Sequence, residues 1–297
     1  MDVGIGLPNA VPGLDGKVLA GWAKDAEARG FSTLGTIDRL LYPNYEPLIA
    51  LTAAAAVTER IRLMTDIMIS PYRNNTPLLA KQAVSLDNVS GGRLVLGVAP
   101  GWRDDDYKAS GVDYAARGRI LDEQLAEMTR LWAGESLDGL GTVGPEPGRR
   151  GGPEIMIGGG VKAAYRRAAQ YGSGWTMGGG TPDQMREGRE ALDSAWAEAG
   201  RDGRAKASVL TYFCLGPNAK ETASAYIHAY YEPMGEEIAN MIADSVAVDE
   251  ETIAGYVQAY EDAGADEVVF FPCSTDVGQV EALAGAVGEP AGLRAPT

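Results

Sequence analysis

The chain has 297 residues and a formal net charge of −15, from 26 basic and 41 acidic side chains. That acidic balance disfavours nucleic acid and anionic membrane surfaces as binding partners. Two cysteines cannot form a disulfide framework, and a single histidine excludes a metal site that needs several imidazoles. The N-terminal residues lack the positive charge and long apolar run of a signal peptide, and no run approaches the roughly 18 apolar residues of a membrane span, so we expect a cytoplasmic protein.

Short apolar runs alternate with helical patterns along the whole chain. Eight runs rich in β-branched residues predict strands at residues 3–7, 33–37, 61–67, 94–99, 155–157, 174–177, 209–215 and 267–271. The helical patterns between and after them cover residues 17–29, 46–58, 77–89, 119–132, 161–171, 182–199, 219–231, 250–263 and 276–287. This order is typical of parallel strands joined by crossover helices.

The strands are apolar nearly throughout, which indicates burial on both faces. Eight strand-helix units in a chain of this length therefore predict a (β/α)8 barrel as a single domain over residues 1–297. Two intervals are too long for one simple unit. Residues 134–152 predict an inserted loop after the fourth helix, and residues 219–263 hold two or three helical patterns between the seventh and eighth strands. Long insertions are usually functional or mobile, and we expect both to help shape a substrate pocket.

The fifth predicted strand runs through glycines directly into a helix. Gly158, Gly159 and Gly160 separate the apolar run from Val161, where the helical pattern begins. Backbone N–H groups freed by glycine at a helix N-terminus, with the positive end of the helix dipole behind them, can bind phosphate. Gly158, Gly160 and Ala163 also match the Gly-x-Gly-x-x-Ala dinucleotide turn, although the acid expected after the next strand is absent. A tight turn without a ligand is the alternative.

The second and fourth strand ends carry charge. Asp38 could act as an acid, a base or a hydrogen-bond acceptor from a ring N–H; an ion pair with a neighbour, or with Arg39, is the alternative. After the fourth strand, Gly101 and Trp102 allow backbone and a flat side chain to approach a planar ring, and Arg103 could meet an anionic group.

No residue is predicted to be a strongly activated nucleophile or metal ligand. Cys214 lies inside an apolar strand, where burial raises a thiol pKa, and Lys162 lies beside the predicted phosphate loop. His228 could donate a proton, but a lone histidine in a helical pattern is more often a helix residue. The aspartates at 104–106 predict a solvated acidic loop start rather than a divalent-cation site, since no second cluster of oxygen ligands accompanies them.

Arg39, Met177, Tyr212 and Tyr230 are the candidates for a substrate pocket, with ordinary packing as the alternative for the tyrosines. A barrel with a phosphate loop, many tyrosines and no strong acid-base constellation fits a protein that holds a cofactor and lets the cofactor react.

Several longer motifs give the chain a recognisable relationship. They include Thr-Glu-Arg-Ile-Arg-Leu before the third strand, Leu-Asp-Asn-Val-Ser-Gly-Gly-Arg-Leu before the fourth, and Gly-Ala-Asp-Glu before the last, at residues 58–63, 86–94 and 264–267. Others lie at residues 71–73, 77–82, 96–102, 157–159 and 167–172. With these motifs the chain resembles the bacterial luciferase-like family, the flavin-dependent and coenzyme F420-dependent oxidoreductases built on a (β/α)8 barrel.

The resemblance implies that an isoalloxazine or deazaflavin ring lies across the mouth of the barrel. The cofactor phosphate is then expected near residues 158–161 and near Gly178, Gly179, Gly180 and Thr181. A non-proline cis peptide is expected behind the ring, around Asp66, Ile67 and Met68. The family also implies a homodimer.

Two departures from the family bear on the cofactor. Relatives that use F420 often carry Asp-His after the second strand, where this chain has Asp38-Arg39, and the luciferases place an arginine near Pro100 to meet the FMN phosphate. We expect reduced FMN, supplied by a separate flavin reductase, and oxidation of a small organic substrate with molecular oxygen, because such chemistry needs mainly a dry pocket. The alternatives are an F420-dependent dehydrogenase or reductase, in which Asp38 assists proton movement, and a flavin-binding protein without turnover.

Overall fold

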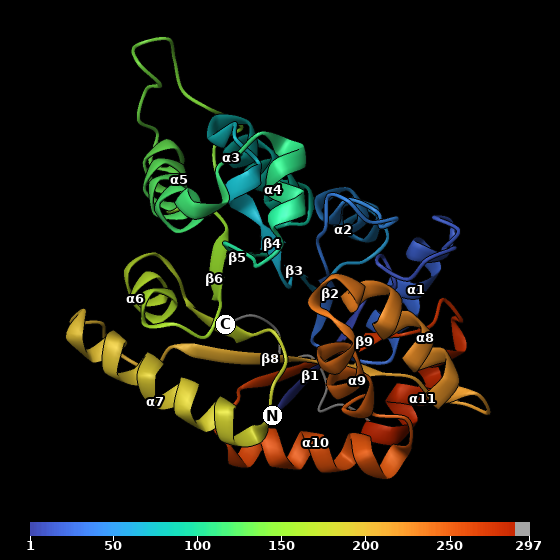
Figure 1. Cartoon of the computed structure of the whole chain (residues 1–297). Helices are drawn as coiled ribbons and strands as arrows, with labels where there is room; N and C mark the ends of the chain where they lie inside the picture. The colour runs from blue at the N-terminus through green and yellow to red at the C-terminus, as the bar shows by residue number, and fades with distance from the viewer. Residues whose placement is uncertain (289–297) are drawn as a thin grey trace.

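The apolar runs of the sequence form strands that are buried on both faces and joined by helices packed outside them (Figure 1). The computed structural model describes residues 1–288. Its strands are β1 (Asp2–Gly6), β2 (Thr33–Thr36), β3 (Arg62–Thr65), β4 (Met68–Ile69), β5 (Leu94–Ala99), β6 (Glu154–Gly158), β7 (Gly174–Met177), β8 (Lys206–Phe213) and β9 (Glu267–Pro272).

The sheet closes into a barrel. Neighbouring strands follow the order β3-β2-β1-β9-β8-β7-β6-β5-β4, and the parallel pairing of β3 with β5, which sets Leu63 opposite Leu94, completes the ring. β3 and β4 are two parts of one stave, interrupted at Asp66 and Ile67, so the barrel has eight staves. This architecture confirms the predicted (β/α)8 barrel.

The helices that surround the barrel correspond to the predicted ones. They are α1 (Val18–Ala28), α2 (Pro47–Ala55), α3 (Thr76–Val89), α5 (Arg117–Trp132), α6 (Lys162–Tyr171), α7 (Pro182–Glu198), α8 (Ala219–Tyr231), α10 (Glu250–Asp262) and α11 (Gly278–Val287). Among residues 1–288, no helix combines the length and the apolarity that crossing a membrane requires.

One short helix, α4 (Asp104–Ser110), replaces the acidic loop start that the sequence predicted. Its first turn consists of Asp104, Asp105 and Asp106, whose carboxylates interact favourably with the positive end of the helix dipole. Gly111, at φ 71°, ends it in the left-handed region. Only two of its residues are buried, so no apolar periodicity revealed the helix.

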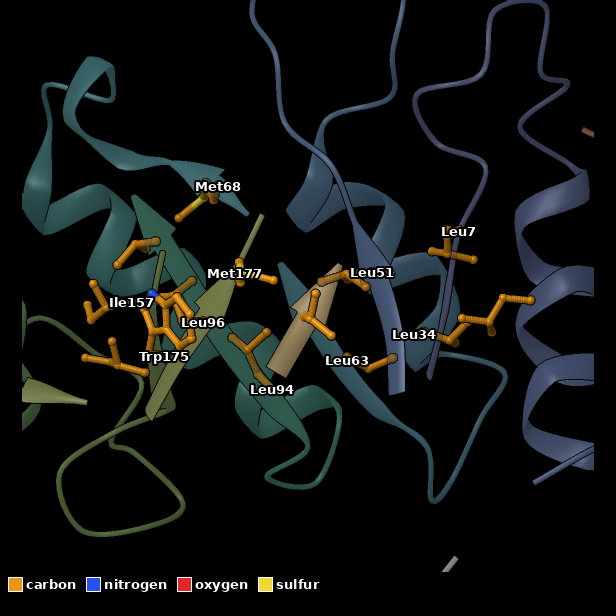
Figure 2. Packing of buried hydrophobic residues seen from close by; sticks show 14 of the residues in the cluster. Leu7, Leu34, Leu51, Leu63, Met68, Leu94, Leu96, Ile157, Trp175 and Met177 are labelled. Atoms are coloured by element: carbon orange, nitrogen blue, oxygen red, sulfur yellow. The ribbon is translucent and has the colours of Figure 1, made fainter. Parts of the chain in front are cut away.

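The main hydrophobic core lies between the strands and the helices. Figure 2 shows Leu34 of β2, Leu63 of β3, and Leu94 and Leu96 of β5, together with Leu51 of α2. All five side chains are buried in one continuous cluster. Burying a leucine side chain contributes about 2 kcal/mol, so this layer fixes the positions of the strand ends that carry the candidate site.

Glycine leaves room for one aromatic ring among the strands. A Cβ on Gly6 or Gly35 would lie 2.3 or 2.5 Å from ring atoms of Phe271, which comes from β9 and is buried. These two glycines are therefore required by packing rather than by backbone conformation.

The first insertion, residues 134–152, joins α5 to β6 and forms the long loop between them in Figure 1. Lys81 donates from Nζ to the carbonyl of Gly144 at 2.8 Å, and Arg149 donates to Asp87 and to the carbonyl of Leu94, the first residue of β5. The loop thus lies along α3 and at the amino ends of the strands. Our expectation that it shapes a pocket at the carboxyl ends is wrong, because a helix-to-strand connection lies at the opposite end of a barrel.

The second insertion follows the carboxyl end of β8 and contains α8, α9 (Glu236–Asp244) and α10. A short 3-10 turn at Glu232–Met234 connects α8 with α9. Because a strand-to-helix connection lies at the carboxyl ends, this insertion, unlike the first, brings its tyrosines to the mouth of the barrel.

Candidate functional site

Most of the predicted site residues meet at the carboxyl ends of the strands. Asp38 and Arg39 follow β2, residues 101–103 follow β5, residues 159–161 follow β6, and residues 178–181 follow β7. Parallel pairing in register places these ends around one rim. The site is built from this rim and from the part of α8 that reaches it.

The peptide bond between Asp66 and Ile67 is cis, as the family resemblance implied. Ile67 faces Gly158, since a Cβ on that glycine would lie 2.4 Å from the Ile67 Cδ1 atom. Met68 instead packs in the hydrophobic core and pairs with Val98 (Figure 2). Of the three predicted residues, Ile67 is therefore the one that the structure brings towards the glycine turn after β6.

Asp66 is a buried carboxyl group in the interior of the barrel. Thr176 donates its hydroxyl to Asp66 Oδ1 at 2.9 Å, while Oδ2 has no hydrogen-bond partner among the described residues. Burial raises the pKa of Asp66 to about 7, and the charge of Glu267 adds to that rise. Sequence patterns give no sign of such a group, because its pKa depends on the closure of the barrel around it.

The glycine turn after β6 is open on its outer side. Gly159 has φ 117°, a backbone conformation that side chains rarely adopt, and both Gly159 and Gly160 are exposed. The helix α6 that follows has extended Val161 at its N-cap and no side-chain cap. Its first-turn N–H groups therefore have no side-chain acceptor, and the positive end of the helix dipole favours an anion there. Trp175 fixes the turn by donating Nε1–H to the carbonyl of Gly159 at 2.7 Å.

The glycine turn after β7 is also exposed, but it is tied differently. Gly179 and Gly180 have φ 93° and 136°, and Tyr260 donates its hydroxyl to the carbonyl of Gly180 at 2.6 Å. Thr181 and Gln184 form a reciprocal capping box that satisfies N–H groups at the start of α7. Of the two turns, the one after β6 thus has the freer N–H donors for a phosphate.

Asp38 accepts four hydrogen bonds, two of them from an arginine. This ion pair is the structural alternative to a catalytic role that the sequence left open. It accepts from the backbone N–H of Ile69 at 2.9 Å, from the Tyr72 hydroxyl at 2.7 Å, and from Nη1 and Nη2 of Arg73 at 2.6 and 3.1 Å. Its partner is Arg73, not Arg39. This carboxylate therefore fixes the segment after β4 against the end of β2, and its own side chain is only 1% exposed.

The acidic residues of α4 are each paired with a basic side chain. Lys108 pairs with Asp104, Arg103 with Asp105, and Arg39 Nε donates to Asp106 at 2.9 Å. The hydrogen bonds from Arg103 lower the pKa of Asp105 to about 2. Arg39 also approaches Asp105 at 3.5 Å, so the two arginines share this carboxylate.

Aromatic side chains cover the same region. Trp102 stacks on Tyr231 with an interplanar angle of 11°, and the hydroxyls of Tyr231 and Tyr212 lie 3.0 Å apart. Tyr230 packs edge-on against Tyr42. Burial raises the pKa of Tyr212, Tyr230 and Tyr231, so these hydroxyls are neutral donors near pH 7.

Two further candidates lie away from this region. Met177 packs in the main hydrophobic core with its sulfur beneath Gly180, in a different cluster from Tyr212 and Tyr230. His228 forms hydrogen bonds with Ser224 and with Asn240 of α9. The interpretation of His228 as an ordinary helix residue is therefore confirmed, and its side chain joins α8 to α9. Its hydrogen bond to Asn240 raises its pKa.

The residues that sequence reasoning missed are the partners of the charged groups. Tyr42, Arg73 and Thr176 were not predicted to take part, although Arg73 lies in a motif shared with the family. A basic residue at the carboxyl end of the stave next to Asp38 was the one available signal.

The structure thus combines a parallel (β/α)8 barrel with an open glycine turn before an uncapped helix N-terminus, an arrangement that favours an anion at that turn. The sequence profile of luciferase-like monooxygenases matches residues 1–293. The chain belongs to this luciferase-like family.

The relatives of this chain include an uncharacterized protein, a monooxygenase and a reductase. An uncharacterized protein of Mycobacterium tuberculosis is 34% identical over 191 residues, 55% of this chain and 66% of its own length. The FMNH2-dependent dimethylsulfone monooxygenase of Pseudomonas putida is 25% identical over 72% of this chain and 56% of that protein. The 5,10-methylenetetrahydromethanopterin reductase of Methanolobus tindarius is 26% identical over 70% and 63%. In each case the chain matches less than two thirds of the relative's length.

Solved structures share the fold over nearly the whole chain. The monooxygenase RslO1 of Streptomyces bottropensis has a TM-score of 0.76 at 21% identity, covering 97% of this chain and 96% of that one. An F420-dependent secondary alcohol dehydrogenase, in complex with an F420-acetone adduct, has a TM-score of 0.81 at 16% identity, covering 97% and 99%.

Proposed function

We propose that the protein is an oxidoreductase that binds reduced FMN and uses it, with molecular oxygen, to oxidise a small organic molecule. The observation that carries the proposal is the open Gly159-Gly160 turn before the uncapped N-terminus of α6. Backbone N–H donors and a helix dipole at such a turn favour a phosphate group. The similarity to the FMNH2-dependent monooxygenase of Pseudomonas putida supports FMN.

The residues present fit such a cofactor. Gly159, Gly160 and the first turn of α6 would hold the phosphate, with residues 178–181 beside it. Ile67, on the segment beside that turn, offers an apolar surface for a planar ring. Bound reduced flavin supplies the electrons that activate oxygen. The protein's part is to bind, orient and exclude water, which the buried tyrosines of α8 do.

An F420-dependent dehydrogenase or reductase is the second candidate. The reductase of Methanolobus tindarius favours it, and a deazaflavin cofactor also carries a phosphate. In this chain Arg39 takes the place of the expected imidazole after β2, and Asp38 is saturated by Arg73 and its neighbours. Proton movement by Asp38 would require it to leave that ion pair, so we rank hydride transfer second. A flavin-binding protein without turnover is the third candidate.

The test is oxygen uptake by the purified protein with chemically reduced FMN, across a panel of small organic substrates. The proposal expects substrate-dependent consumption above that of free reduced FMN. A parallel reaction with F420 and alcohols follows deazaflavin reduction by absorbance. Reduction of F420 with no oxygen uptake in the first assay would establish the second candidate instead, and flavin binding with neither activity would favour the third.

We also propose a homodimer, with reduced flavin delivered by a separate reductase. Ile49 on α2 and Leu78 and Val89 on α3 are 68, 49 and 63% exposed, and Leu40 and Leu41 add apolar surface beside α2. Apolar side chains gathered on two adjacent helices are typical of a surface that a second copy covers.

A further inference from the structure

Three hydrogen-bond donors at the mouth of the barrel are buried without an acceptor among residues 1–288. They are Nη1 of Arg39, the hydroxyl of Tyr42 and Nη1 of Arg103. The side chains of Arg39 and Arg103 are only 4 and 9% exposed. A buried donor without an acceptor destabilises a protein, and a charged donor does so more strongly, so this concentration requires an explanation.

The three donors belong to one cluster. The guanidinium carbon of Arg39 lies 5.6 Å from the ring centroid of Tyr42. Asp105 joins Arg39 to Arg103, since both arginines contact it. We call the cluster the mouth box and define it as Arg39, Tyr42, Trp102, Arg103, Tyr212, Tyr230 and Tyr231.

The two carboxylates beside the mouth box, Asp105 and Asp106, already accept hydrogen bonds. Asp106 accepts from Arg39 Nε at 2.9 Å and from the backbone N–H of Leu41 at 2.8 Å, while Asp105 accepts from Nε and Nη2 of Arg103. The guanidinium groups that carry the remaining donors lie beside aromatic rings, with the carbon of Arg39 5.6 Å from the centroid of Tyr230 and that of Arg103 5.2 Å from the centroid of Trp102. A ligand that completes this cluster must therefore bring acceptor oxygens and a flat apolar body.

We propose that the mouth box is the substrate subsite and that it binds a planar, largely apolar molecule through a carboxylate, with Arg39, Tyr42 and Arg103 as the specificity-determining donors. Two carboxylate oxygens can accept several hydrogen bonds at once, and bonds between ionised partners are the stronger ones. The rings of Tyr230, Tyr231 and Trp102 pack against the body of the molecule. Calling the ligand a substrate rests on the proposed function; the binding of the carboxylate does not.

Access to the mouth box is through its outer wall. Trp102 is 42% exposed and stacks on Tyr231, whereas Tyr212 and Tyr230 behind them are buried. Under the proposal, the ligand enters by displacing this exposed stacked pair.

The shared chemistry of the ligand is an oxyanion, and the cofactor phosphate is a second source of it. The glycine turns follow β6 and β7, whereas Arg39 follows β2 and Arg103 follows β5. The freer N–H donors of the α6 turn provide for a phosphate without the arginines, which favours the substrate as the occupant of the mouth box.

The first test is calorimetric titration of the cofactor-free protein with benzoate, with benzyl alcohol as a neutral analogue. The decisive variant is Tyr42→Phe. Its lost hydroxyl has no partner among the described residues, so the melting temperature should not fall. Benzoate should bind more tightly than benzyl alcohol, and Tyr42→Phe should weaken benzoate about tenfold. Arg103→Met should weaken it further, and the control Tyr256→Phe, which removes a hydroxyl on α10 outside the mouth box, should not.

The second test titrates FMN and riboflavin, which differ by the phosphate, into the same variants. The proposal expects Tyr42→Phe and Arg103→Met to leave both affinities unchanged. Selective loss of FMN affinity would assign the donors to the cofactor phosphate and overturn the proposal, as would benzoate affinity equal in Tyr42→Phe and Tyr256→Phe. Benzoate binding with no affinity for FMN or F420 would instead overturn the proposed function and leave the carboxylate subsite standing.

Discussion

Asp66 makes the stability of the protein depend on pH in a specific direction. Its pKa lies near 4 in an unfolded chain and is raised to about 7 in the folded barrel, mainly by burial. Below pH 4 both states carry the proton, and ionisation costs nothing. As the pH rises from 4 towards 7, the unfolded state releases the proton while the folded state keeps it, so the free energy of unfolding falls.

The size of the effect follows from the shift. A difference of about three pKa units corresponds to about 4 kcal/mol, reached in full above pH 7. Asp66→Asn removes the ionisation and keeps an oxygen that accepts from Thr176. We therefore expect the free energy of unfolding of the variant to rise relative to that of the wild type, by about 2 to 3 kcal/mol between pH 5 and pH 8.

Urea denaturation at a series of pH values measures this difference. Asp262→Asn makes the same chemical change on the exposed surface of α10, and its difference from the wild type should not change over the same range. The reasoning fails if Asp66→Asn is less stable than the wild type at pH 8, or if the difference in free energy of unfolding does not grow with pH. Either result would show that the folded barrel does not raise the pKa of Asp66.

Three further substitutions test separate parts of the structure. Gly159→Val should lower FMN affinity at least tenfold, because Gly159 has φ 117° and lies exposed in the proposed phosphate turn. Gly160→Ala should leave folding intact. Equal FMN affinity in Gly159→Val and the wild type would contradict the placement of the phosphate at this turn. Asp38→Ala should destabilise by about 3 kcal/mol in urea denaturation, since it leaves the largely buried Arg73 with only the partly exposed Glu46 as a carboxylate partner. A loss well under about 1 kcal/mol would show that the pair with Asp38 is unimportant. Ile49→Lys combined with Leu78→Lys should yield a monomer by light scattering, and an unchanged dimer would exclude this face as the interface.

The fold could be predicted because the periodicities are local. The strand β5 and the strand β7 have the predicted bounds, since turn residues flank each apolar run. β8 begins at Lys206, three residues before the predicted start, because the polar residues there pair with Gly174 of β7 and Glu267 of β9. Such pairing is decided by neighbouring strands and leaves no local signal.

The site could be predicted in part, for the same reason. The glycine turns are contiguous in sequence, and their conformations follow from residue type. The ion pairs are not contiguous: Asp38 meets Arg73 across 35 residues and Arg39 meets Asp106 across 67. Which charges meet depends on where the barrel places the strand ends. The sequence alone therefore could not decide between a catalytic role and a structural ion pair for Asp38.

The most direct measurement of the central claim is an equilibrium titration of the purified protein with FMN, riboflavin and F420, followed by quenching of flavin or deazaflavin fluorescence. The account predicts saturable binding of a phosphorylated cofactor, FMN or F420, with riboflavin markedly weaker than FMN. Absence of saturable binding by both phosphorylated cofactors would contradict it.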